Sequence, residues 1–353
     1  MNKALITGIS GMDGSILAEL LISQGWNVYG LVRKINSPNH WRINHLLNHP
    51  LLRLFEGDVT SLESVHQAVE KSQPDMVFNL AAHSFVPHSW AEPVNTFQVS
   101  AVGVMNILES IRNINRSIRF YQASSSEMFG KAKNGPQNEE TPFYPYSPYG
   151  VAKVAAHYAT INYREIFNIH ATSGILYNHE HERRGDQFVT RKITKGVAQF
   201  FVNKLKKMPC HPIRLGNLDA QRDWGYAEDY VKAMIKIINH PIPDNFVVAT
   251  GITRTVREWC GATVYAAIKC LGLPYENIVW KGSGMDEQGF INDELLFVVA
   301  KEFYRPAEDN VLCGNSLKAQ QKLGWQIETT FEKMVERMVY SDISINLSTR
   351  NSI

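Results

Sequence analysis

The chain has 353 residues, of which 44% are hydrophobic and 20% are charged, so it can bury a large core and is long enough for two domains. A formal net charge of +2 argues against nucleic acid as the default partner, and no apolar run is long enough to span a bilayer. The opening MNKALITG enters a strand pattern too soon for a signal peptide. Four scattered cysteines without a CxxC pair indicate reduced thiols, so we expect a cytoplasmic protein.

The first half of the chain alternates short apolar runs with amphipathic stretches. Strands are predicted, in chain order, at 3–8, 26–32, 51–57, 75–82, 118–124 and 170–178. Helical patterns lie between them, for example at 14–25 and 61–72. Strand and helix in strict turn predict an α/β fold with a Rossmann-type, doubly wound parallel sheet, in which ligands bind at the carboxyl ends of the strands.

The second half of the chain is less regular. Short strands are predicted at 212–217, 245–251, 277–282 and 295–303, and the clearer helices at 255–272 and 330–343. We expect a dinucleotide-binding domain made of residues 1–177 and about 218–246, and a smaller C-terminal α/β substrate-binding lobe made of about 178–217 and 247–342. Residues 343–353 are predicted to form a loose tail.

A glycine-rich turn follows the first predicted strand, in the stretch ALITGISGMDGS. Gly8, Gly11 and Gly14 permit a tight turn and a close backbone approach to a diphosphate, which the start of the next helix attracts. An ordinary strand-to-helix turn is the alternative. The position of the motif at the first strand of an alternating pattern favours dinucleotide binding.

The second predicted strand ends in GLVRKIN, which places Arg33 and Lys34 where an NAD-specific site has an acid. Two cations suit the 2′-phosphate of NADP. A solvated basic loop explains them equally well on this feature alone.

Tyr149 and Lys153 form a YxxxK pair in SPYGVAK, at positions i and i+4 of a predicted helix, so they share one face. The lysine can lower the pKa of the phenol from its usual value of about 10. Upstream, an apolar strand runs into QASSSEMFG, where period-two alternation puts Ser125 and Glu127 on the same side. A glutamate that merely begins a helix is the alternative to a catalytic acid.

The glycine spacing and the YxxxK pair together resemble the extended branch of the short-chain dehydrogenase/reductase superfamily. The resemblance implies that the hydroxyl of Ser125 holds the substrate oxygen that Tyr149 deprotonates. An acid two residues beyond that hydroxyl is what a sugar-nucleotide dehydratase adds. Glu127 would then remove the C5 proton of the sugar and protonate the C6 hydroxyl as it leaves.

A closer resemblance extends from the start of the chain to about residue 342. The chain is similar to the GDP-mannose 4,6-dehydratase family in KALITGISGMDGS, FYQASSSEMFGK, TPFYPYSPYGVAK, GILYNHEHERRGDQFVTRKI, LGNLDAQRDWGYAEDYV, FVVATG and FYRPAED. The implied activity converts GDP-mannose to GDP-4-keto-6-deoxymannose and water. It proceeds by transient C4 oxidation, C5/C6 elimination and hydride return to C6, with NADP regenerated in each turnover.

The resemblance also implies roles for individual residues, and it implies no metal ion. The catalytic residues would be Ser125, Glu127, Tyr149 and Lys153. The cofactor would contact Gly8, Ile9, Gly11, Met12, Asp13, Gly14, Arg33, Asp58, Val59, Leu80, Ala81, Ala82, Ser84, Lys153, His179 and Arg184. The GDP-sugar would contact Ser84, Asn178, Lys192, Asn217, Arg222, Arg305 and Glu308. Without the family match, the segment HEHERRGD would read as a solvated charged loop.

Several positions depart from the usual family pattern. NLAAHSFV replaces NLGAQSHV, Ser125 stands at a usual threonine, and Met12, Asn95 and Tyr146 stand at a usual glutamine, tyrosine and arginine. Because several of these lie near the expected hexose, a dehydratase of GDP-manno-heptose is an alternative. A GDP-4-keto-6-deoxysugar reductase or epimerase and a dinucleotide-sensing protein are others. Residues 33–46 resemble a family loop that reaches a neighbouring subunit's cofactor, so a homodimer or homotetramer is expected.

Overall fold

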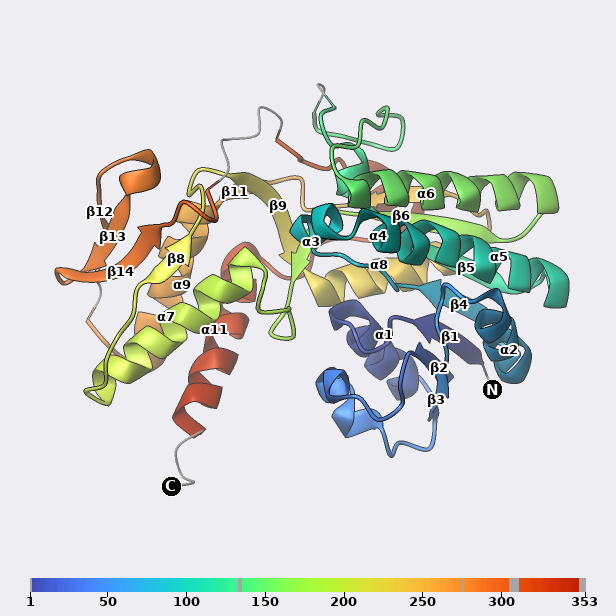
Figure 1. Cartoon of the computed structure of the whole chain (residues 1–353), viewed down its shortest axis with the longest axis horizontal. Helices are drawn as coiled ribbons and strands as arrows, with labels where there is room; N and C mark the ends of the chain where they lie inside the picture. Colours follow the sequence, from blue (N-terminus) through green and yellow to red (C-terminus); the bar gives the residue numbers. More distant parts are fainter. Residues whose placement is uncertain (1, 133–134, 275, 305–310, 349–353) are drawn as a thin grey trace. The chain divides into compact units, whose positions relative to one another are not determined.

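A computed structural model of the chain describes residues 2–132, 135–274, 276–304 and 311–348 (Figure 1). Within these residues the chain divides into two compact units. The first comprises residues up to 179, 227–251 and 312–327, and the second comprises 180–226, 252–311 and the residues from 328 onward. None of the described helices is long and apolar enough to cross a lipid bilayer.

The first unit contains a parallel sheet of seven strands within the described residues. The strands are β1 (Lys3–Thr7), β2 (Asn27–Val32), β3 (Leu52–Glu56), β4 (Met76–Asn79), β5 (Arg119–Ser125), β6 (Ala171–Leu176) and β10 (Asn245–Val248). They lie in the order β10-β6-β5-β4-β1-β2-β3 and every printed pairing is parallel. The strand order reverses between β1 and β4, and such a switch point opens a ligand crevice at the carboxyl ends of the two strands.

Helices cover both faces of this sheet (Figure 1). On one face lie α1 (Met12–Ser23), α8 (Ala227–Asn239) and α10 (Leu317–Leu323), and on the other lie α2 (Leu62–Ser72), α5 (Gly103–Ile114) and α6 (Pro148–Phe167). Successive side chains of β1 point to opposite faces of the sheet. Ile6 packs in the core with α1 and α8, whereas Leu5 packs in the core with α2 and α5. The predicted α/β class and the doubly wound sheet are confirmed.

The connection between β4 and α5 contains two short helices, α3 (Val86–Ala91) and α4 (Pro93–Phe97). A short 3₁₀ turn, η4 (Ser126–Met128), follows β5 directly. Both connections leave the carboxyl edge of the sheet, so their first residues lie where a parallel sheet binds its ligands.

Among the described residues of the second unit, three helices pack together: α7 (Val189–Leu205), α9 (Val256–Leu271) and α11 (Phe331–Ser348). Its described strands are β8 (Ile213–Leu215), β9 (Gln221–Tyr226), β11 (Thr253–Thr255), β12 (Val279–Lys281), β13 (Gln288–Ile291) and β14 (Glu294–Val299). A mixed sheet has the order β12-β13-β14-β8, and a smaller one has the order β11-β9-β7, where β7 is Asn178–Glu180.

Three of the expected domain limits are wrong. Residues 312–327 belong to the first unit, because α10 packs on α8 and β10 and the indole of Trp325 donates to the carbonyl of Asp229 at 2.8 Å. Residues 218–226 belong to the second unit, since β9 pairs with β11. The expected loose tail is helical as far as Ser348, because Ile343 is buried and Asp342 forms a buried ion pair with Arg191.

Candidate active site

The turn between β1 and α1 brings separate backbone segments into close contact. Gly8 has a φ of +73°, and a Cβ on it would lie 2.8 Å from the backbone nitrogen of Ala81. A Cβ on Gly14 would lie 2.3 Å from the carbonyl oxygen of Gly8. Gly11 is the N-cap of α1 and provides no side-chain cap. The turn therefore requires glycine, and the start of α1 presents backbone N–H groups to an anion.

Asp13 and His179 meet beside this turn. The Oδ2 atom of Asp13 lies 2.9 Å from Nε2 of His179, and Nδ1 of His179 lies 2.7 Å from the carbonyl oxygen of Tyr177. The His179 ring stacks on Tyr230 with a centroid distance of 4.5 Å. Ile9 and Met12, the other candidates of the turn, are buried against the core.

The remaining cofactor candidates of the first unit lie at the carboxyl ends of β2, β3 and β4. Arg33 is exposed directly after β2, and Val59 is buried after β3. Oδ1 of Asp58 accepts hydrogen bonds from the backbone N–H of Thr60 at 2.9 Å and from its hydroxyl at 2.8 Å. After β4, Leu80, Ala81 and Ala82 are partly buried and Ser84 is exposed. A cradle of backbone at the glycine turn, with an exposed cation at the end of β2, fits a dinucleotide.

The serine cluster at the end of β5 has an alternating burial pattern. Ser124 and Ser126 are buried, whereas Ser125 and Glu127 are partly exposed. The hydroxyl of Ser125 accepts a hydrogen bond from the backbone N–H of Glu127 at 3.2 Å. The hydroxyl of Ser124 instead lies 2.9 Å from Nδ1 of His157. Ser125 and Glu127 are therefore the members of the cluster that are open to a ligand.

Tyr149 and Lys153 lie on the first turns of α6, whose N-cap Ser147 accepts from the N–H of Gly150 at 3.0 Å. Both side chains are almost completely buried, and Nζ of Lys153 lies 5.7 Å from the centre of the Tyr149 ring. A Cβ on Gly150 would lie 2.6 Å from the carbonyl oxygen of Glu127, so the start of α6 and η4 are in contact. The structure thus brings these two residues next to the end of β5.

Burial sets the charge state of two groups around α6. It lowers the pKa of Lys153 to about 8, although the carboxylate of Asp13 acts in the opposite direction. Lys153 donates a 2.7 Å hydrogen bond to the carbonyl oxygen of Ala123 on β5. Burial also lowers the pKa of His157 to about 4, so this imidazole is neutral at physiological pH and serves as a partner for Ser124.

A buried chain of polar side chains connects the glycine turn to Lys153, and sequence reasoning missed it. Thr7 donates to Oδ1 of Asn79 at 2.5 Å, and Asn79 donates to Oε1 of Gln122 at 2.7 Å. Gln122 donates to the carbonyl of Ala123 at 3.0 Å, which is the acceptor that Lys153 also uses. The sequence does show one polar residue near the carboxyl end of each of three predicted strands. That these three residues lie side by side depends on the register of the strands, which the sequence pattern does not give.

The second unit carries the other cation candidates. Nε of Arg184 lies 3.1 Å from Oε2 of the buried Glu180, and its guanidinium lies over the ring of Phe188. Nζ of Lys192 lies 3.6 Å from the centre of the Phe303 ring, and burial lowers its pKa.

The other substrate candidates differ in how far the structure describes them. Asn217 accepts from the N–H of Asp219 at 2.9 Å, and Arg222 donates to the carbonyl of Gln221 at 2.8 Å. Asn178 is partly buried at the start of β7. Arg305 and Glu308 lie outside the described residues.

Comparison with known proteins places the chain in a class. The crystal structure of dTDP-glucose 4,6-dehydratase from Bacillus anthracis in complex with NAD matches it with a TM-score of 0.74 and 18% identity, over 97% of this chain and 96% of that one. The protein therefore belongs to the fold class that this dehydratase represents.

Sequence relatives narrow this class. A family model described as GDP-mannose 4,6 dehydratase matches residues 5–338. GDP-mannose 4,6 dehydratase 2 of Caenorhabditis elegans is 43% identical over 97% of this chain and 89% of its own length. GDP-mannose 4,6 dehydratase of Homo sapiens is 40% identical over 99% of this chain and 94% of its own. The chain belongs to the GDP-mannose 4,6-dehydratase family of hydro-lyases, which confirms the predicted family.

Proposed function

We propose that the protein dehydrates GDP-mannose to GDP-4-keto-6-deoxymannose with a resident NADP. One observation supports the proposal beyond family membership: Ser125 and Glu127 are both partly exposed at the end of β5, and the helix that carries Tyr149 and Lys153 packs against this turn. A reductase or a simple epimerase needs the hydroxyl, the phenol and the lysine. Elimination of water also needs a group that accepts a carbon-bound proton and donates one to a leaving hydroxyl.

Most of the residues proposed to hold NADP lie along the carboxyl edge of the seven-stranded sheet. The turn from Gly8 to Gly14 meets the diphosphate, and Arg33 with its neighbour Lys34 meets the 2′-phosphate. Asp58 and Val59 flank the adenine, and the segment 80–84 lines the nicotinamide side. His179 and Arg184 are further proposed contacts. When bound, NADP accepts a hydride from C4 of the sugar and returns it to C6, so the reaction consumes no reductant.

The first catalytic task falls to Tyr149, which removes the proton of the C4 hydroxyl while Ser125 hydrogen-bonds the same oxygen. Lys153 carries its positive charge at neutral pH, since its pKa is about 8, and this charge stabilises the phenolate of Tyr149. The hydrogen bond to the carbonyl of Ala123 holds the lysine in place, and the polar chain through Gln122 orients that carbonyl.

Glu127 performs the elimination. The ketone at C4 acidifies the hydrogen at C5, and the carboxylate of Glu127 removes it. The resulting carboxylic acid then donates the proton to the C6 oxygen, which leaves as water. One carboxyl group therefore acts first as base and then as acid. The return of hydride to C6 requires a proton at C5, and Tyr149 holds the proton that it took from the C4 hydroxyl. With that proton delivered to C5, Glu127 and Tyr149 both end the cycle in their starting ionisation states.

The GDP part is proposed to bind residues that the family resemblance singles out. Lys192 and Arg222 supply positive charge for the diphosphate, and Ser84, Asn178 and Asn217 supply hydroxyl and amide groups. Arg305 and Glu308 complete the proposed set. Burial lowers the pKa of Lys192, and an adjacent phosphate would act in the opposite direction.

We also propose a homo-oligomer, either a dimer or a tetramer. Apolar side chains are exposed together around α3, α4 and the start of α6, including Trp90 (62%), Val94 (70%) and Tyr146 (60%). Exposed apolar groups that cluster in this way mark interaction surfaces. Light scattering of the purified protein tests the proposal, and a monomer at micromolar concentration would contradict it.

The variant Glu127→Gln tests the chemistry directly. It keeps the size of the side chain but can neither accept the C5 proton nor protonate the C6 oxygen. We expect turnover to fall by about 10²–10⁴-fold. With GDP-mannose present, NADPH should accumulate on the enzyme, detected by its absorbance, and deuterium from solvent should not enter C5.

Tyr149→Phe is the matched control. It should show the same loss of product without the NADPH signal, because C4 oxidation itself is blocked. If Glu127→Gln forms 4-keto-6-deoxy product at nearly the wild-type rate, the glutamate only begins a turn and the proposed mechanism is wrong. A panel of GDP-sugars analysed by mass spectrometry separates mannose from manno-heptose. Net NADPH consumption would instead identify a reductase.

A further inference from the structure

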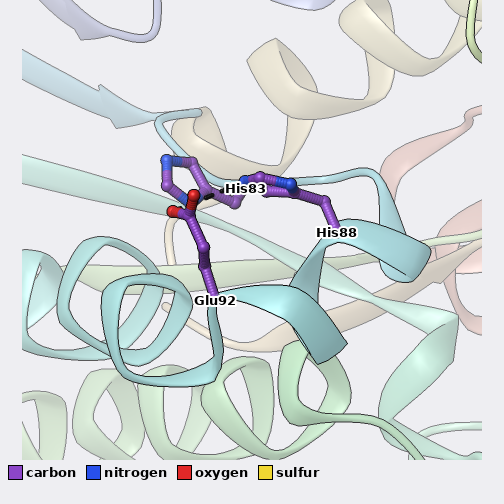
Figure 2. A group of neighbouring side chains, drawn as sticks. All are labelled: His83, His88 and Glu92. Carbon is purple, nitrogen blue, oxygen red and sulfur yellow. Dashed lines mark ion pairs between the residues drawn. The ribbon is translucent and has the colours of Figure 1, made fainter.

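A second cluster of ligand-type side chains lies outside the catalytic group, on the connection between β4 and α4. It consists of His83, three residues after Leu80, together with His88 on α3 and Glu92 at the end of α3. Figure 2 shows the three side chains pointing toward one another. One ligand atom from each residue lies within 4.8 Å of the other two.

The separations suit a small metal ion. With metal–ligand bonds of about 2.1 Å, tetrahedral ligand atoms lie about 3.4 Å apart. Nε2 of His88 is already 3.6 Å from Oε2 of Glu92. No separation in the cluster exceeds 4.8 Å, which is at most about 1.4 Å above the tetrahedral value, and His88 and Glu92 are exposed, so side-chain rotation can close the difference.

The backbone explains why the cluster forms. His88 and Glu92 are four residues apart, and the N–H of Glu92 bonds to the carbonyl of His88 at 3.0 Å, so the helical spacing that puts them on one face continues to Glu92. The amide of Asn95 donates to Oε2 of Glu92 at 2.9 Å. A hydrogen bond of this kind orients the carboxylate in many metal sites.

His83 carries a ring nitrogen whose hydrogen-bonding capacity is not satisfied by the described residues. Its Nδ1 atom is buried and makes no hydrogen bond to any described residue. Buried nitrogens without a partner are uncommon and call for an explanation. Arg33 acts on the same ring and opposes a cation here, whereas the carboxylates of Glu92 and Asp58 favour one.

We propose that His83, His88 and Glu92 bind a Zn²⁺ ion, with water in the fourth position. Two imidazoles and one carboxylate are a ligand set that Zn²⁺ uses in proteins. The family resemblance implied no metal ion. The bound ion ties the segment after β4 to the end of α3.

The test uses the full chain without a histidine tag, after treatment with a chelator. Calorimetric titration with Zn²⁺ should give about one ion per chain, and Co²⁺ should give visible absorption bands that Zn²⁺ abolishes. Zn²⁺ should also raise the melting temperature, since an ion that binds only the folded state stabilises it. The variants His88→Ala and Glu92→Gln each remove one ligand at an exposed position and should weaken binding by more than about 10-fold.

Two further variants sharpen the result. Asn95→Ala removes only the group that orients Glu92 and should weaken Zn²⁺ binding by about 10-fold, the lower end of the range for such partners. His211→Ala removes an exposed histidine of the second unit and should leave the affinity unchanged. The proposal is overturned if the wild type binds no stoichiometric Zn²⁺, or if His88→Ala and Glu92→Gln bind it as tightly as the wild type. Circular dichroism confirms that each variant is folded.

Discussion

Lys153 is proposed to be a catalytic group whose buried charge lowers the stability of the folded state. The variant Lys153→Met should therefore be more stable than the wild type and less active. The side chain is 2% exposed, and burial is the main reason why its pKa falls from 10.5 to about 8. One pKa unit corresponds to about 1.4 kcal/mol, so the ammonium costs the folded state about 3 kcal/mol at neutral pH. Methionine has a similar length and carries no charge.

The hydrogen bonds around Lys153 determine how much of this cost the variant recovers. Loss of the 2.7 Å bond to the carbonyl of Ala123 removes about 1 kcal/mol. That carbonyl keeps a partner, because Gln122 donates to it at 3.0 Å, so no buried acceptor is left unsatisfied. We expect Lys153→Met to unfold in urea with a free energy about 2 kcal/mol above that of the wild type, while turnover of GDP-mannose falls by at least about 10²-fold.

The difference should depend on pH in a defined direction. The folded pKa of about 8 lies below the unfolded value of 10.5, so the unfolded chain binds more protons between these two pH values. The stability of the wild type therefore gains from deprotonation of Lys153 as the pH rises from 8 to 10.5, a gain that Lys153→Met lacks. The advantage of the variant should be largest near pH 7 and vanish by about pH 10.

Both proteins must be free of NADP for this comparison, since a bound ligand adds its own stabilisation. A variant less stable than the wild type by 1 kcal/mol or more, or an advantage that does not change with pH, would show that the buried ammonium is not a net cost. The reasoning from burial would then be wrong.

Three further predictions concern the sheet edge. Asn79→Leu leaves two buried partners without their hydrogen bonds and should lower the free energy of unfolding by about 2–6 kcal/mol, measured in urea; a loss below 1 kcal/mol would contradict the buried chain. Gly14→Ala places a methyl 2.3 Å from the carbonyl oxygen of Gly8 and should abolish NADP binding in calorimetry, whereas Gly261→Ala meets no atom within 4 Å and should not. Arg33→Asp should weaken NADP far more than NAD, and equal losses for both would refute the proposed 2′-phosphate contact.

Local patterns in the chain determined much of the fold and of the candidate site. The first six strands lie where alternating apolar runs predicted them, because a strand buried on both faces must be apolar along its length. Two parts of the candidate site could be predicted from residues that are close together in the sequence. These are the glycine turn, from the spacing of Gly8, Gly11 and Gly14, and the shared helix face of Tyr149 and Lys153. Period-two alternation predicts that Ser125 and Glu127 share a side, and in the structure both are partly exposed between buried neighbours.

Other features of the protein were decided only by the tertiary structure, because these features depend on contacts between residues far apart in the chain. Thr7, Asn79 and Gln122 form one chain only in the register of three neighbouring strands, and a shift of one residue would turn each side chain to the other face. Helix α10 returns to the first unit because it packs against α8 there. His83 joins His88 and Glu92 because the chain bends between β4 and α3, and spacing along a sequence does not specify where a connection folds back on itself.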